Sequence, residues 1–163
     1  MSSVSSSNKK GLATAVLTTG LLAGTLDILS ACTHAYLARG TTPATVFKYI
    51  ASALLGMEAF AGGTGTILLG LLMHYAIAFS WTLLFFLIYP KLPFLWKNRI
   101  VSGIIYGAFV WVIMSLVLVP LTEVPKGPFN PTSAAIGMII LMLMIGMPNA
   151  FRARAFYGPP PSR

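Results

Sequence analysis

Long apolar runs, separated by short polar or proline-containing segments, dominate the chain. A helix rises about 1.5 Å per residue and a bilayer core is about 30 Å thick, so a run of 20 or so apolar residues spans it. Arg39 and Gly40 end the first run, and Pro90, Pro120 and Pro148 end the later ones. The pattern predicts four spanning helices, at residues 12–38, 64–89, 100–120 and 132–148.

The segment at residues 43–60 is apolar but shorter than the spans, and it is charged. Thr42 followed by Pro43 is typical of a helix start, in which a hydroxyl cap precedes a proline. Lys48 and Glu58 make a position across the bilayer costly. We therefore predict an interfacial or re-entrant helix here, with a full span as the alternative.

Polar segments flank this helical region. Residues 1–10 are rich in serine and predict a disordered tail. Residues 11–151 form the predicted transmembrane domain, and residues 152–163 form a second, arginine- and proline-containing tail. The expected fold is an all-α membrane protein, a four-transmembrane-helix bundle with one extra interfacial or re-entrant helix.

Composition agrees with a lipid environment. Of 163 residues, 56% are hydrophobic and only 9% are charged, whereas soluble domains carry about 25% charge. The net charge of +8 could suggest nucleic acid, but the basic residues flank apolar runs and do not alternate with aromatic residues on a polar face. We therefore expect no nucleic-acid partner, and membrane lipids as the counter-charge. The lone Cys32 excludes an intrachain disulfide.

The basic residues also predict an orientation. With four spans, the two tails and the 91–99 loop share one side of the membrane. That side holds eight basic residues: Lys9, Lys10, Lys91, Lys97, Arg99, Arg152, Arg154 and Arg163. The other side holds three: Arg39, Lys48 and Lys126. The positive-inside rule then places both termini in the cytoplasm.

An acidic residue near the middle of the first span is the most unusual feature. Insertion of Asp at such a position costs about 2.5–3.5 kcal/mol. Gly20, Asp27 and His34 recur every seven residues, so they share a helix face, and Gly24 falls on the same side. We expect this small, polar face to point into the bundle. Asp27 is then either a proton or cation site, with His34 as partner or relay, or a protonated group that hydrogen-bonds another helix.

Two further residues complete a candidate intramembrane polar site of Asp27, His34, His74 and Glu58. His74 lies in the second span, and Glu58 precedes the Gly62–Gly63 break, where it could pair with Lys48 or cap the turn. Two histidines without ligand spacing are weak evidence for a metal or haem iron, so we expect no metal and no cofactor. The chain has no phosphate-binding loop, zinc pattern or nucleophile motif, and its three acids leave little for catalysis, so we expect no enzyme.

Two glycine pairs have the GxxxG spacing that permits close helix approach. They are Gly20 with Gly24, and Gly103 with Gly107. Such pairs pack helices together either within one bundle or in a homo-oligomer. The spacing does not distinguish the two.

Several stretches resemble a known family. They are His74-Tyr-Ala-Ile-Ala-Phe-Ser, Tyr89-Pro-Lys-Leu-Pro-Phe-Leu-Trp96, Gly103-Ile-Ile-Tyr-Gly107 and Val119-Pro-Leu-Thr122. This pattern is similar to the YagU-like family of small bacterial inner-membrane proteins of unknown function. The first half, with Gly24-Thr-Leu-Asp27-Ile, resembles unnamed relatives of the same kind. The resemblance implies a bacterial cytoplasmic membrane location and a link to acid or other stress, and it supplies no catalytic residues.

Three function hypotheses follow. The first is a non-enzymatic multi-pass membrane protein that supports envelope or stress homeostasis. The alternative is an oligomeric small transporter or proton-coupled channel whose path is lined by Asp27, His34 and His74. The third is a cofactor-bearing membrane redox subunit.

Overall fold

The structure confirms the predicted fold class. The computed structural model of the chain describes residues 2–125 and 130–158, and of residues 2–10 it describes the backbone only. This part of the chain is helical, without strands. Within it, four helices are long and apolar enough to cross a membrane: Gly11–Arg39, Thr64–Lys91, Arg99–Leu121 and Pro131–Tyr157. A shorter apolar helix lies between the first two.

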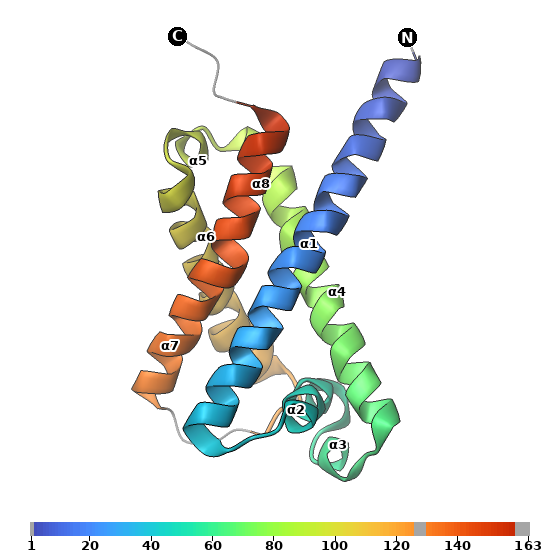
Figure 1. Cartoon of the computed structure of the whole chain (residues 1–163), viewed down its shortest axis with the longest axis vertical. Helices are drawn as coiled ribbons and strands as arrows, with labels where there is room; N and C mark the ends of the chain where they lie inside the picture. The colour runs from blue at the N-terminus through green and yellow to red at the C-terminus, as the bar shows by residue number, and fades with distance from the viewer. Residues whose placement is uncertain (1, 126–129, 159–163) are drawn as a thin grey trace.

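The helices form an up-and-down bundle whose two ends differ. The long elements are α1 (Ser2–Arg39), α4 (Thr64–Ile88), α6 (Arg99–Ile113), and α7 (Pro131–Leu141) with η4 (Met142–Gly146) and α8 (Met147–Tyr157). The start of α1, the end of α8 and the short α5 (Phe94–Lys97) lie at one end, which we call the termini end (Figure 1). Helices α2 (Pro43–Leu55) and α3 (Glu58–Ala61) lie at the other, the α2 end.

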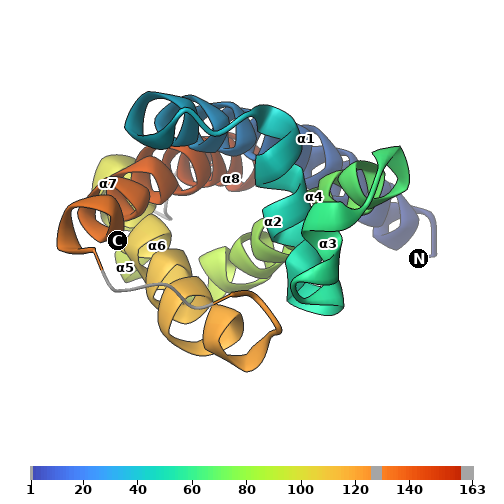
Figure 2. The same ribbon diagram turned by 90° about the horizontal axis from the view of Figure 1, so that it is seen from below.

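Helix α2 is short because local signals start and stop it. Thr42 is its N-cap and its side chain accepts a hydrogen bond from the Thr45 amide, while Pro43 occupies the first turn, as expected. Gly56, with a φ of 57°, ends it in a conformation that favours glycine. The helix crosses the α2 end of the bundle (Figure 2). It packs so closely on α4 that a methyl group at Gly70 would collide with the Phe47 carbonyl.

Two π-helical turns allow the third and fourth spans to remain helical at Pro120 and Pro148. The Val119 amide donates to the Met114 carbonyl in η2 (Met114–Leu118), and the Met147 amide donates to the Met142 carbonyl in η4. A proline follows each of these amides, and proline cannot donate to the carbonyl four residues earlier. Widening the preceding turn accommodates the missing bond.

The fourth span therefore extends beyond the predicted end at residue 148. Pro148 is placed in the first turn of α8, and the helix continues to Tyr157. Asn149, Ala150 and Ala153 are buried, which indicates that packing holds this extension in the bundle. The third span ends through a 3-10 turn, η3 (Val119–Leu121), close to its predicted boundary.

The predicted tails are only partly covered. The backbone is helical from Ser2, but the side chains of residues 1–10 lie outside the described part, so disorder there stays a prediction. Of the second tail, residues 159–163 lie outside it, as does Lys126.

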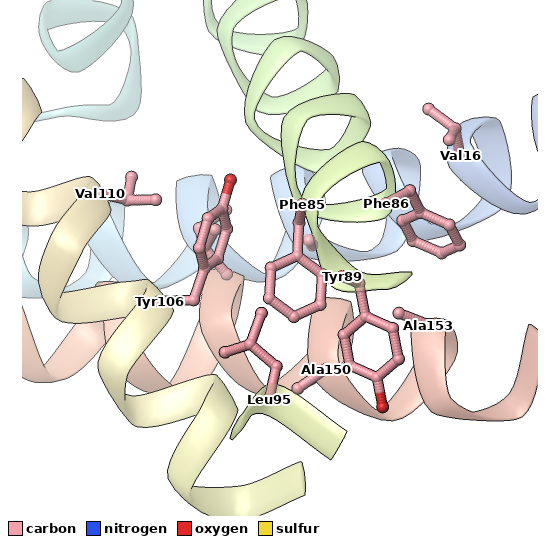
Figure 3. Packing of buried hydrophobic residues seen from close by; sticks show 11 residues of the cluster. Val16, Phe85, Phe86, Tyr89, Leu95, Tyr106, Val110, Ala150 and Ala153 are labelled. Atoms are coloured by element: carbon pink, nitrogen blue, oxygen red, sulfur yellow. The ribbon is translucent and has the colours of Figure 1, made fainter. Parts of the chain in front are cut away.

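The hydrophobic core lies toward the termini end, where α4, α6 and α8 meet (Figure 3). The rings of Phe85 and Tyr106 have centroids 4.5 Å apart, and the Tyr106 hydroxyl donates to the Trp81 carbonyl at 2.5 Å. A 3-10 turn, η1 (Tyr89–Lys91), follows α4, and the Trp96 indole donates to its Tyr89 carbonyl at 2.6 Å. These bonds join the end of α4 to α5 and α6, and they leave the rest of α4 to pack on α1 and α2.

Candidate functional site

Glycines bring α1 and α4 together near the middle of the bundle. A methyl group at Gly24 would lie 3.1 Å from the Ala78 Cβ atom and 3.1 Å from the Tyr75 ring. One at Gly20 would collide with the Phe79 ring. The small face of α1 that the sequence predicts therefore packs inside the chain, against the neighbouring antiparallel span (Figure 1).

His74 forms a hydrogen bond across this contact. Its Nε2 atom lies 2.8 Å from the Gly24 carbonyl oxygen, and the side chain is buried. A carbonyl oxygen only accepts, so Nε2 carries the proton in this bond and Nδ1 remains as the second nitrogen of the ring. The hydroxyls of Thr25 and Tyr75 form a second bond between the same helices, at 2.8 Å.

Asp27 lies beside this histidine. Asp27 is half-buried and lies one helical turn beyond Gly24, whose carbonyl oxygen binds His74, so its carboxyl group is close enough to feel the charge of a protonated imidazole. Asp27 lies near the middle of the apolar span Gly11–Arg39, well away from both ends. The α1–α4 interface thus places an acid and a base near each other at the depth where unpaired charge costs most.

A second polar level lies closer to the termini end. Thr19 and Thr82 are buried, and within the described part of the chain their hydroxyl oxygens have no hydrogen-bond partner. Thr19 and Asp27 are eight residues apart on α1, as are Thr82 and His74 on α4. Because Gly24 faces Ala78 and the helices are antiparallel, this spacing puts the two threonines at one level. Ala23 and Ala78, both buried, separate the two levels.

Thr19, at one end of the row formed by Asp27, His74, Thr82 and Thr19, also lines a cavity. It has a volume of about 230 Å³, lies between α1 and α8, and is lined by Ala15, Thr18, Thr19, Arg152, Ala155 and Phe156. Thr19 thus belongs to both the buried row and the cavity wall. We name the row Asp27, His74, Thr19 and Thr82, together with this cavity, the polar stripe.

The other two candidate residues lie apart from the pair. His34 is half-buried and lies ten residues beyond Gly24, which is about 15 Å along α1. Glu58 is exposed in α3 at the α2 end. The Lys48 ammonium group donates to the Phe60 carbonyl at 3.1 Å, so this lysine caps α3. The structure therefore places Asp27 near His74 across the α1–α4 contact, whereas His34 lies about two turns away along α1. The described part of the chain holds no group of three metal-binding side chains.

The second glycine pair also packs within one copy of the chain. A methyl group at Gly107 would lie 2.6 Å from the Leu141 carbonyl oxygen, and one at Gly103 would lie 3.0 Å from the Met147 Cα atom. Gly146, in η4, completes this contact, because a methyl group there would collide with the Gly103 carbonyl. Both pairs therefore hold the bundle together.

Sequence reasoning missed Thr19, Thr82 and the bond between Thr25 and Tyr75. A signal for the threonines was present, since Thr19, Ala23 and Asp27 recur every four residues, as do His74, Ala78 and Thr82. Each set is a small or polar stripe on a helix face. Pairing one stripe with the other requires the register of two helices, which spacing alone does not supply.

Compared with known proteins, the chain matches no family model, no curated protein and no solved structure.

Proposed function

We propose that this multi-pass membrane protein binds and passes protons at the Asp27–His74 pair, as a small proton-coupled transporter or channel. The proposal rests on one observation: a backbone carbonyl of α1 binds the ring of His74 between two spanning helices, one helical turn from the half-buried acid Asp27. Ionisable residues that face the inside of a membrane bundle commonly mark ion or proton paths, because their insertion is costly.

The two side chains are suited to exchange a proton. The Asp27 carboxylate can accept one, and the His74 ring can accept one at Nδ1 while Nε2 keeps its bond to Gly24. Transfer of a proton from Asp27 to His74 forms a carboxylate and an imidazolium, and the attraction between these opposite charges offsets part of their cost in the bilayer.

The polar stripe offers a route by which protons could move from Asp27 and His74 toward the termini end. Hydroxyl groups both donate and accept, so Thr19 and Thr82 can carry hydrogen bonds on toward the cavity lined by Thr18 and Arg152. Buried hydroxyls without a protein partner are typical positions for a bound water molecule. The route leads from the pair to the termini end.

For location and role we propose the bacterial cytoplasmic membrane, with both termini in the cytoplasm, and a part in envelope or stress homeostasis. The orientation rests on the excess of basic residues at the termini end. The role rests on the resemblance to YagU-like proteins, which links such proteins to acid stress. A path for protons suits that setting.

Proton flux into proteoliposomes tests the proposal. Purified protein is reconstituted into vesicles that contain a pH-sensitive dye, and an imposed pH gradient drives the flux. We expect the wild-type protein to conduct protons faster than empty vesicles. Asp27→Asn should reduce the flux to the background of empty vesicles, because the amide takes up no proton.

Glu58→Gln is the matched control, since it removes an acid that is exposed at the α2 end. It should leave the flux unchanged. Far-UV circular dichroism and the elution volume should be the same for all three proteins. Equal flux in wild-type and Asp27→Asn vesicles, or no flux above empty vesicles, would overturn the proposal.

A further inference from the structure

A second cavity lies at the termini end, between α5, the start of α6 and the last turns of α8. It has a volume of about 310 Å³ and is lined by Trp96, Lys97, Asn98, Arg99 and Arg154. Three of these five residues are basic. We call it the basic cavity.

The chain itself fixes the walls of the basic cavity. Arg154, in the last turn of α8, is half-buried and donates to the Trp96 carbonyl at 3.4 Å. The Arg99 guanidinium lies 4.3 Å from the centre of the Phe151 ring. Asn98 is the N-cap of α6, and its side chain accepts from the Ile100 and Val101 amides. Two guanidinium groups are thus held near one opening by contacts that leave donors free.

No aspartate or glutamate of the chain lies at this end to neutralise these cations. The chain has three acids in all. Asp27 is in the middle of α1 and Glu58 is in α3 at the α2 end, while the Glu123 amide donates to the Ala53 carbonyl of α2. Like charges gathered in one opening are destabilising unless an anion joins them.

We propose that the basic cavity binds the phosphate group of an anionic phospholipid. Guanidinium forks match the oxygens of a phosphate in shape and charge, and Lys97 adds a third positive group. The cavity opens beside the ends of α4 and α6, where the spans leave the apolar layer and headgroups lie. Basic openings between spanning helices on the cytoplasmic side are suited to acidic headgroups. This inference does not depend on proton transfer at Asp27.

Trp96 provides a probe inside the cavity wall. Its indole is fixed by the bond to Tyr89, and Trp81 and Trp111 can be replaced by phenylalanine to leave it as the single fluorophore. The protein is placed in vesicles of phosphatidylcholine that contain a minor share of brominated phosphatidylglycerol, or the same share of brominated phosphatidylcholine. Bromine quenches only a neighbouring indole, so we expect stronger quenching by the anionic lipid.

Variants that remove single charges distinguish binding in the basic cavity from a general attraction of anionic lipid to a basic protein. The preference for phosphatidylglycerol should fall about fivefold for each of Lys97→Gln, Arg99→Gln and Arg154→Gln. Lys97 is exposed, so Lys97→Gln tests the cavity with little risk to folding. Arg39→Gln with Lys48→Gln removes charge at the α2 end and should keep the preference.

Three outcomes would overturn the inference. The first is equal quenching of the wild-type protein by both lipids. The second is a preference for phosphatidylglycerol that stays unchanged in the cavity variants, or that falls as much in the Arg39→Gln and Lys48→Gln control as it does in them. The third is loss of the lipid preference on adding inorganic phosphate at constant ionic strength, which would assign the cavity to the free anion. Persistence of the preference in phosphate supports the lipid.

Discussion

His74 lies close to two residues of the neighbouring helix α1, Gly24 and Asp27. Its Nε2 atom donates to the Gly24 carbonyl, and Asp27 lies three residues further along α1, near the imidazole ring. Both contacts require the helices to be close, and Gly24 permits this because any side chain there would press on Tyr75 and Ala78. Packing and chemistry therefore depend on the same few positions.

Removing single hydroxyls should show how much the interhelical bonds contribute. Tyr75→Phe removes the bond to Thr25, and Tyr106→Phe removes the bond to the Trp81 carbonyl. Each should lower the free energy of unfolding by about 1 kcal/mol, the usual value for such bonds within membranes. Tyr36→Phe, at an exposed position of α1, is the control and should cost almost nothing. Unfolding in mixed micelles with increasing SDS measures all three, and an equal loss for Tyr36→Phe would contradict the assignment.

The buried threonines should behave in the opposite way. Thr19→Ala with Thr82→Ala removes two hydroxyls that have no protein partner in the described part of the chain, so stability should be retained. Proton flux should fall, because the hydroxyls continue the polar stripe beyond Asp27. Thr33→Ala, whose exposed hydroxyl binds the Leu29 carbonyl within α1, is the matched control. Unchanged flux in the double variant would remove the threonines from the path.

Glycine contacts set how the helices pair. Helix α1 meets α4 through Gly20 and Gly24, and α6 meets η4 through Gly103, Gly107 and Gly146. Side chains between helices gain little from apolar burial in lipid, so close backbone packing has to supply the association. The π turn in η4 belongs to this contact, since it places Gly146 against the Gly103 carbonyl.

A single methyl group should disrupt the α6 contact. Gly107→Ala places a Cβ atom 2.6 Å from the Leu141 carbonyl oxygen, and overpacking of this kind costs about 1–3 kcal/mol. Gly65→Ala, in the first turn of α4, meets open space and should be neutral or slightly stabilising. The same SDS titration compares them. If both variants were equally stable, the close approach of α6 and η4 would be wrong.

Charge distinguishes the two ends of the whole molecule. Lys91, Lys97, Arg99, Arg152 and Arg154 lie at the termini end, where the basic cavity opens. Glu58 and Glu123 lie at the α2 end together with Arg39 and Lys48. This difference supports the proposed cytoplasmic orientation of the termini end.

Cysteine labelling in intact cells tests that orientation. In a Cys32→Ala background, Lys91→Cys and Glu123→Cys each place one exposed thiol at one end of the bundle. A membrane-impermeant maleimide should label Glu123→Cys in bacterial spheroplasts and should label Lys91→Cys only after lysis. The reverse pattern would invert the topology.

Much of this architecture was predictable, and the partner of Asp27 was not. The length of the apolar runs was enough to predict the four spans, and Thr42 with Pro43 predicted the start of α2. Pro148 was misleading, because a π turn and the packing of Ala150 let the helix continue past it. Spacing along one helix suggested His34 as the partner of Asp27. Contacts between helices depend on their register, and that register places His74 on the Gly24 carbonyl, near Asp27.

Infrared difference spectroscopy shows whether Asp27, near His74, binds a proton. Wild-type protein in lipid nanodiscs is titrated from alkaline to acid pH while the carbonyl band of protonated carboxylic acids is followed. We expect a band that grows on acidification, shifts in frequency in His74→Ala, remains in Glu58→Gln and is missing in Asp27→Asn. A band that is unchanged in Asp27→Asn, or no band assignable to Asp27 at any pH, would contradict it.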